Sequence, residues 1–219
     1  MKFDKKSLLL YAVTDRTWLN GRSLYEDVEK AIQGGATLIQ LREKNLDYEN
    51  FKIEALKIQE LCRKYQIPFI INDNVELAKE INADGVHVGQ NDMNAKNVRE
   101  ILGNEKILGV SAQTPEEAIS AENNGADYIG AGAVFHTGTK LDAVEVTHET
   151  LKKICNSIKI PVVAIGGINA KNILQLENSG IYGVAVVSAI FASENIKSAT
   201  QELRKLSEKI TKKYHENVN

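Results

Sequence analysis

The chain has 219 residues, of which 43% are hydrophobic, and its formal net charge is −2 with a pI near 6.1. This length suits one large domain with a substantial core, so we expect residues 1–219 to form a single domain. The charge lacks the basic footprint of a nucleic-acid binder, and the first apolar run is too short for a secretory signal or a membrane span. We therefore expect a soluble, cytoplasmic protein whose partner is a small molecule, not a nucleic acid or a membrane.

Short apolar runs rich in valine and isoleucine alternate with longer amphipathic stretches, which is typical of βα units around a parallel sheet. The eight runs are 8–13, 38–41, 69–71, 85–88, 107–110, 128–131, 162–165 and 183–187. This order predicts an α/β fold, a (βα)₈ TIM barrel, with a short N-terminal extension. A final helix over about 194–214 carries Leu203, Leu206 and Ile210 on one face and should cover the outside of the barrel.

Helix boundaries carry signals of their own. Residues 23–26 (SLYE) and 114–117 (TPEE) fit the capping box, and Pro115 occupies the first helical position, where proline is tolerated. Gly34, Gly125 and Gly180 suit the left-handed conformation just past a helix end. Cys62 and Cys155 lie in helical patterns without a C-x-x-C partner, which favours a packing role.

Polar residues at the carboxyl ends of the strands are the candidates for chemistry, because TIM barrels place their sites there. The second strand continues into QLREK (40–44). Since strand side chains alternate between faces, Gln40 and Arg42 should point into the mouth while Leu41 packs outward. A cation in the mouth needs an anion, although a solvated charged loop also explains Lys44.

Two acidic residues follow neighbouring strands, Asp73 after the third and Asp92 after the fourth. Neighbouring strands lie about 4.8 Å apart, so the two carboxylates can converge on one point. Like charges at about 4 Å repel by roughly 4 kcal/mol at an effective dielectric of 20, which calls for a cation between them. A small set of oxygen ligands suits Mg²⁺. The alternative is helix capping, by Asn74 and by Asp92.

Further polar groups follow the remaining strands. Ser111 can donate to a phosphate or a ring substituent, although a turn serine is the alternative. Residues 137–140 (TGTK) form a natural phosphate cradle, and Gly166 and Gly167 allow close backbone approach. Val187 and Ser188 at the eighth strand supply a second wall for an anion, as in other barrels. His87 lies among valines, which favours packing, whereas His136 is a candidate base.

These residues stand in segments that together resemble thiamine phosphate synthases over about residues 9–190. The segments are VTD, QLREK, IINDN, ADGVHVGQND, GVSAQT, GADYIGAGAVFHTGTK, VVAIGGI and GVAVVSAI. The resemblance implies a transferase of thiamine biosynthesis. Such enzymes join 4-amino-2-methyl-5-(diphosphooxymethyl)pyrimidine to a thiazole phosphate and release pyrophosphate.

The resemblance also implies roles for single residues. The pyrimidine diphosphate would contact Gln40, Leu41, Arg42, Glu43, Lys44, Asn72, Ser111 and Lys140. Arg42, Lys140 and Ser111 would be catalytic, and Asp73 and Asp92 would bind Mg²⁺. The thiazole phosphate would contact Thr137, Gly138, Thr139, Gly167, Val187 and Ser188.

Two positions depart from the family pattern, which usually has proline where His136 stands and often glycine where Thr147 stands. His136 invites comparison with thiazole tautomerases, related barrels that rearrange the thiazole without joining it. Those relatives generally lack the full threonine, magnesium and QLREK set. A non-catalytic binder of thiamine precursors is the third alternative, and the oligomeric state, including a homo-oligomer, stays open.

Overall fold

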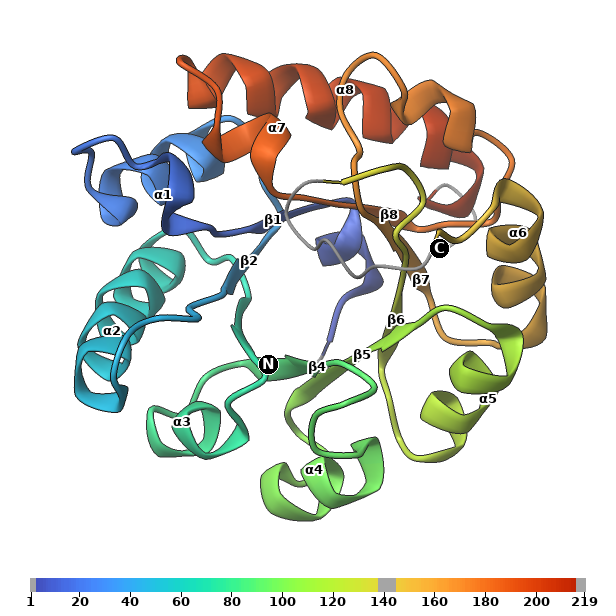
Figure 1. Cartoon of the computed structure of the whole chain (residues 1–219), viewed down its shortest axis with the longest axis horizontal. Coiled ribbons are helices and arrows are strands. Elements are labelled where there is room, and N and C mark those ends of the chain that lie inside the picture. The colour runs from blue at the N-terminus through green and yellow to red at the C-terminus, as the bar shows by residue number, and fades with distance from the viewer. Residues whose placement is uncertain (1–2, 138–144, 216–219) are drawn as a thin grey trace.

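The structure is a computed structural model that describes residues 3–137 and 145–215, with side chains described up to residue 212. Eight parallel strands close into a barrel in sequence order, and β8 pairs with β1 (Figure 1). The strands are β1 (Leu10–Val13), β2 (Leu38–Leu41), β3 (Phe69–Asn72), β4 (Gly85–Val88), β5 (Ile107–Ala112), β6 (Tyr128–Ala131), β7 (Val162–Ile165) and β8 (Gly183–Val186). The expected (βα)₈ TIM barrel is confirmed.

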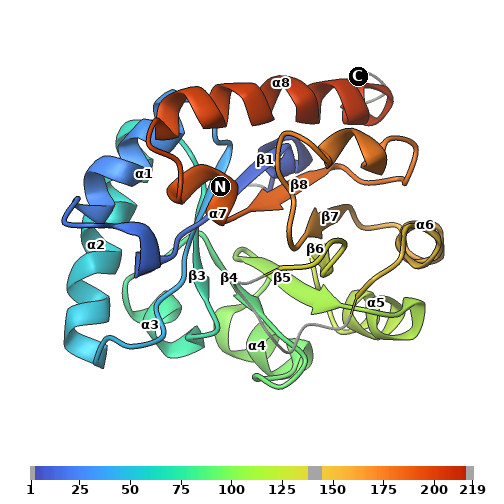
Figure 2. The same ribbon diagram turned by 45° about the horizontal axis from the view of Figure 1, so that its top comes forward.

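Helices surround the barrel (Figure 2). The α-helices are α1 (Leu24–Gln33), α2 (Tyr48–Lys64), α3 (Val75–Glu80), α4 (Ala95–Leu102), α5 (Pro115–Asn123), α6 (His148–Ser157), α7 (Ser188–Phe191) and α8 (Ile196–His215). Three 3₁₀ helices accompany them: η1 (Lys5–Leu8), η2 (Arg16–Trp18) and η3 (Ile173–Leu176). Between β7 and β8, where every residue is described, η3 replaces the usual α-helix. No helix among the described residues is long and apolar enough to cross a membrane.

The expected strands differ from the observed ones mainly at their ends. Leu8 closes η1 instead of opening β1, so the first strand begins two residues later than the apolar run. At the other ends, β3 extends to Asn72 and β5 extends to Ala112. The ladder therefore carries polar side chains to the mouth, because Asn72 pairs with His87 and Ser111 pairs with Gly130.

The boundary signals were partly right. Thr114 caps α5 by accepting from the Glu117 N–H at 3.2 Å, but Ser23 makes no side-chain cap bond, so the capping box expected there is wrong. Gly125 and Gly180 are left-handed, with φ of 90° and 100°, as expected. Gly34 is right-handed, with φ of −81°, so that expectation is also wrong.

Gly34 is instead needed for space. A Cβ built on it would lie 2.6 Å from Thr200 Cβ, which shows how closely α8 crosses the end of α1. The face of α8 that carries Leu203 and Ile210 is buried, and Ser207 Oγ donates to the Leu9 carbonyl at 2.6 Å. As expected, the last helix covers the outside of the barrel (Figure 2).

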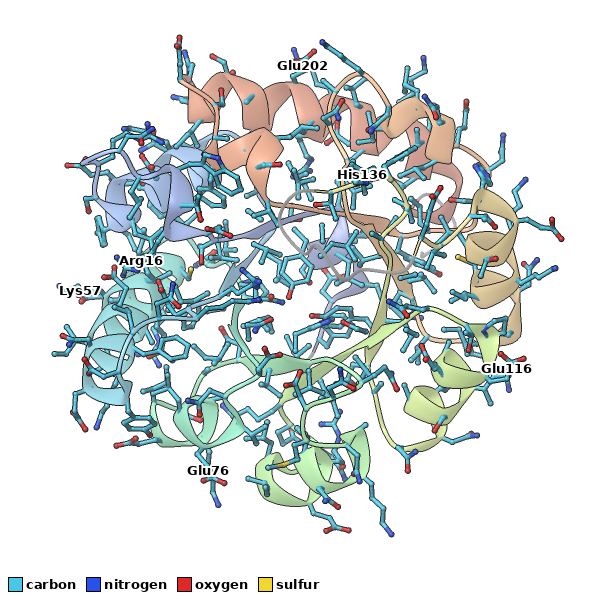
Figure 3. All side chains as sticks on the ribbon, in the orientation of Figure 1. Arg16, Lys57, Glu76, Glu116, His136 and Glu202 are labelled. Atoms are coloured by element: carbon cyan, nitrogen blue, oxygen red, sulfur yellow. The ribbon has the colours of Figure 1, made fainter. Side chains whose placement is uncertain are left out.

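Buried side chains form two clusters, one between strands and helices and one inside the barrel. The inner cluster comes from alternate strand positions, such as Tyr11 and Val13 on β1 and Tyr128 on β6. Figure 3 shows side chains filling the barrel, while Glu76, Glu116 and Glu202 point outward from their helices. Several residues of the inner cluster also line the cavity of the candidate site.

Candidate active site

A cavity of about 600 Å³ lies at the carboxyl ends of the strands, and all eight strands or the loops after them contribute to its lining. It gathers most of the candidate residues that the structure describes. Those that line it are Gln40, Arg42, Asn72, Asp73, Asp92, Ser111, Thr137, Gly167, Val187 and Ser188. Three candidates, Gly138, Thr139 and Lys140, lie outside the described residues.

Asp73 and Asp92 both line this cavity, and Asp92 lies close enough to Asp73 for its charge to raise the pKa of Asp73. Asp73 follows β3 with φ of +60°, and its backbone N–H donates to the His87 carbonyl at 2.8 Å. Asp92 Oδ2 accepts from the Gly89 N–H at 2.8 Å. These backbone bonds fix the loops that bring the two acids together.

Helix capping does not explain either acid. Asn74 caps α3 by accepting from the Leu77 N–H at 2.9 Å, and Asn94, not Asp92, caps α4 by accepting from the Asn97 N–H at 3.0 Å. The capping reading of Asn74 is therefore right, and the capping reading of Asp92 is wrong. Both aspartates remain available to the cavity.

The environment raises the pKa of Asp73 to about 6. Desolvation is the largest cause and repulsion from Asp92 comes next, while hydrogen bonding from Asn72 and the charge of Arg42 act in the opposite direction. Asp73 as a whole residue is exposed at the rim, so water reaches part of it. Repulsion from Asp92 raises the pKa of Asp73 even where water reaches the carboxyl group.

Arg42 is held by the segment that follows β1. Its backbone N–H donates to Thr14 Oγ1 at 3.0 Å, and the Thr14 N–H donates to the Gln40 carbonyl at 3.0 Å. Its guanidinium Nη1 lies 3.4 Å from Asp15 Oδ2. Thr14 and Asp15 therefore fix the course of the QLREK segment and orient Arg42 at the cavity wall.

The rest of the QLREK segment lies apart from the cavity lining. Leu41 is buried in the cluster that faces the helices, and Lys44 is exposed. Glu43 pairs with Arg16, which also pairs with Glu54 on α2, at 2.7 and 2.8 Å (Arg16 is labelled in Figure 3). Burial raises the pKa of Glu43 although Arg16 opposes this. The side chains of Leu41 and Glu43 therefore support the loop in this structure.

A glycine-rich loop forms the wall at the end of β7. Gly166 and Gly167 both have positive φ, and a Cβ on Gly167 would overlap the His136 carbonyl. The Gly167 carbonyl accepts from the side chains of Asn172 at 2.9 Å and Asn169 at 3.2 Å. Because a trans peptide points its C=O and N–H in opposite directions, the N–H of the next residue faces away from these asparagines.

The two positions that depart from the family pattern lie outside the cavity lining. Thr147 caps α6 by accepting from the Thr150 N–H at 3.2 Å. His136 is exposed, and only its neighbour Thr137 lines the cavity (His136 is labelled in Figure 3). Capping of α6 therefore explains why a threonine stands at position 147.

Sequence reasoning missed several residues in the cavity. Tyr11 and Tyr128 lie in apolar runs, yet their hydroxyl groups meet at 2.9 Å inside the barrel. His87, interpreted above as packing, is half-buried, lines the cavity and lies 3.0 Å from Ser111 through Nε2. Glu117 also lines the cavity and accepts from the Gln113 N–H at 2.6 Å. Strand alternation could have revealed Tyr11, because it shares a face with Val13.

Comparisons with known proteins agree with this architecture. The family model for thiamine monophosphate synthase matches residues 10–190. A thiamine-phosphate synthase of Ruminiclostridium cellulolyticum is 53% identical over 194 residues, covering 89% of this chain and 92% of the relative. One from Clostridium tetani is 51% identical, covering 89% and 93%.

A solved structure gives the same result. The thiamine phosphate pyrophosphorylase of Pyrococcus furiosus superposes with a TM-score of 0.87 at 41% identity, covering 94% of this chain and 98% of that one. The resemblance noted in the sequence is therefore confirmed, together with the expectation of an enzyme family of the transferase class. The chain belongs to the thiamine monophosphate synthase family.

Proposed function

We propose that the chain condenses 4-amino-2-methyl-5-(diphosphooxymethyl)pyrimidine with a thiazole phosphate in a magnesium-dependent reaction that yields thiamine phosphate and pyrophosphate. The observation that carries this proposal is that Asp73 and Asp92 line one cavity together with Arg42 and Ser111. Paired carboxylates, a guanidinium and a hydroxyl suit a diphosphate that binds together with a divalent cation.

Asp73 and Asp92 are the residues that would hold Mg²⁺. They offer only oxygen ligands, which suit Mg²⁺ better than softer metals. Mg²⁺ commonly binds to one or two carboxylates and keeps several waters. When bound, the ion would neutralise charge on the diphosphate oxygens.

Arg42 would stabilise the departing pyrophosphate. Negative charge grows on that group as the pyrimidine C–O bond breaks, so a donor already in position lowers the barrier most. The contacts of Arg42 with Thr14 and Asp15 support such preorganisation. Ser111 would donate a further hydrogen bond, and the resemblance assigns the same task to Lys140.

The glycine-rich wall would receive the thiazole phosphate. Gly167, Val187 and Ser188 line the cavity at the ends of β7 and β8, where barrels commonly bind phosphate. The two asparagines that hold the Gly167 carbonyl support an arrangement in which backbone N–H groups, rather than carbonyl oxygens, face an anion. Thr137, Gly138 and Thr139 would complete this subsite.

One assay tests the proposal. Purified protein receives both substrates and Mg²⁺, and thiamine phosphate and pyrophosphate are measured together. We expect the two products in equal amounts and their loss on adding a chelator. Rearranged thiazole without pyrophosphate would instead indicate the tautomerase, and tight binding of both substrates without turnover would indicate a non-catalytic binder. The single-domain organisation and a cytoplasmic location remain predictions.

A further inference from the structure

Five side chains form a continuous hydrogen-bonded row through the interior of the barrel. Gln40 Nε2 donates to the Tyr11 hydroxyl, which lies 2.9 Å from the Tyr128 hydroxyl. The Tyr128 hydroxyl lies 2.9 Å from His87 Nδ1, and His87 Nε2 lies 3.0 Å from Ser111 Oγ. The row thus connects β2, β1, β6, β4 and β5, and both of its ends, Gln40 and Ser111, line the cavity.

The shape of the barrel interior is adapted to this row. A Cβ on Gly109 would overlap both the Tyr128 ring and His87 Nδ1, and one on Gly130 would lie 3.0 Å from His87 Cε1. Gly109 stands between the two rings in the sheet, paired with His87 on one side and Tyr128 on the other. The glycines leave room for the two rings to touch.

Each tyrosine in the row carries one hydroxyl hydrogen. Tyr11 is 1% exposed and Tyr128 is fully buried, and burial raises the pKa of both phenols well above their ordinary value. Both therefore stay neutral, and each can donate only one hydrogen bond within the row. The direction of one bond then determines the direction of the next.

The Gln40 end sets one direction. An amide nitrogen can only donate, so the Tyr11 oxygen accepts there and its own hydrogen goes to Tyr128. The Tyr128 hydrogen then goes to His87 Nδ1. A neutral imidazole that accepts at Nδ1 carries its hydrogen on Nε2, which donates to Ser111.

The Ser111 end requires the same direction. A diphosphate has acceptor oxygens only, so Ser111 must turn its hydroxyl hydrogen toward the ligand. Its oxygen is then left to accept from His87 Nε2. Gln40 at one end and a ligand at Ser111 at the other therefore require the same donor-to-acceptor direction along the row.

We propose that Tyr11, Tyr128 and His87 are positioning residues that hold the His87 hydrogen on Nε2 and thereby direct the Ser111 hydroxyl hydrogen toward the substrate. This inference rests on the proposed function for the identity of the ligand at Ser111. It assigns a task to three residues that do not transfer a group themselves.

The histidine tautomer tests the inference without turnover. Nitrogen-15 NMR of the free, labelled protein at about pH 8.5, two units above the ordinary histidine pKa of about 6.5, reports which ring nitrogen carries hydrogen. We expect His87 with hydrogen on Nε2 and none on Nδ1, with the signal assigned by its loss in His87→Gln. Hydrogen on Nδ1 alone would overturn the proposal.

Gln40→Glu should reverse the row. A carboxylate can only accept, so Tyr11 would donate to it, Tyr128 would donate to Tyr11, and His87 Nδ1 would gain a hydrogen to donate to Tyr128. The size and shape of the side chain hardly change. An Nδ1 that stays without hydrogen in this variant contradicts the proposal.

Kinetics supply a test through Ser111. Tyr128→Phe keeps the ring but breaks the row, so we expect kcat to fall about tenfold in the wild-type background and less than twofold in a Ser111→Ala background, because coupled residues are not additive. Equal losses in both backgrounds, or no loss in either, would refute the link. Tyr65→Phe, which removes a hydroxyl bonded to Glu29 outside the cavity lining, is the matched control.

Failure of the proposed function gives a different result. A wild-type protein that forms no thiamine phosphate would refute that function, while the tautomer is still read in the free protein. If Tyr128→Phe does not fold, the wild-type tautomer and the Gln40→Glu variant still decide.

Discussion

Asp73 and Asp92 lie close together at the mouth of the barrel although both are acidic, and desolvation together with repulsion from Asp92 raises the pKa of Asp73 to about 6. Neither acid caps a helix, because Asn74 and Asn94 fill those positions. The arrangement costs folding stability unless a proton or a cation lies between the two groups. A pair that opposes folding in this way favours a role in binding.

Asp92→Asn should separate binding from folding. The substitution removes the repulsion, so we expect an unchanged or higher Tm without Mg²⁺, together with a loss of synthesis of at least about 100-fold, because a lost metal ligand removes several kcal/mol of charge stabilisation. Thermal unfolding and the assay of thiamine phosphate measure the two effects. Glu100→Gln, an exposed change on α4, is the control. Near-normal turnover in Asp92→Asn would refute the metal assignment.

The raised pKa of Asp73 predicts how stability depends on pH. Between about pH 4 and pH 6 the folded state holds a proton on this group that the unfolded state has released. Without divalent cations, the contribution of Asp73 to the free energy of unfolding should therefore fall as pH rises through this window. Urea unfolding at several pH values measures the slope.

Asp73→Asn is the variant that tests this assignment. Asparagine tolerates the left-handed backbone found at this position, where φ is +60°, so the fold should not suffer. We expect the variant to lose this contribution to the pH slope. In the wild type, Mg²⁺ should bind more weakly below about pH 6, where a proton competes for the same oxygen. If the free energy of unfolding depends on pH in the same way in the wild type and in Asp73→Asn, a group other than Asp73 titrates in this window.

Asp15 should act through Arg42. Its Oδ2 lies 3.4 Å from Arg42 Nη1, and its Oδ1 accepts from the Thr17 N–H at 2.9 Å, so Asp15→Asn can keep the second contact while losing the charge. We expect KM for the pyrimidine diphosphate to rise about three- to tenfold, with KM for the thiazole phosphate unchanged. Steady-state kinetics with each substrate varied in turn measure this. A fall in KM would mean that Asp15 competes with the ligand for Arg42.

The sequence predicted the barrel well because the strands are short apolar runs separated by longer amphipathic stretches. It failed where three-dimensional packing decides. Gly34 ends α1 as expected, but a glycine is required there because α8 crosses closely and not because the backbone is left-handed. Leu8 belongs to an apolar run, but it ends the 3₁₀ helix η1, which precedes β1. Local sequence does not show which helix will pass close to a residue.

The site shows the same division. Asp73 and Asp92 were found because polar residues at strand ends stand out from their surroundings. Tyr11, Tyr128 and His87 were not, because aromatic residues within strands usually pack, and only the closed barrel brings their polar atoms together. The register that pairs His87 with Gly109, and Gly109 with Tyr128, has no signature in any single segment.

Gly167→Ala should damage the glycine-rich wall specifically. Gly167 has φ of +65°, and an added Cβ would overlap the His136 carbonyl and lie 2.9 Å from Phe135 Cβ. Gly103 also has a positive φ, +74° with ψ of −176°, but no atom within 4 Å of such a Cβ, so Gly103→Ala carries a backbone strain of about 1–3 kcal/mol without the overlap.

Comparing the two glycine variants isolates the effect of the wall. We expect both to lower Tm, but only Gly167→Ala to raise KM for the thiazole phosphate, by about tenfold or more, because the displaced loop no longer presents its N–H groups to the anion. KM for the pyrimidine diphosphate should stay within about twofold in both. If the two variants have the same thiazole phosphate KM, the anion binds elsewhere, because only Gly167→Ala disturbs residues 135–136 at the wall.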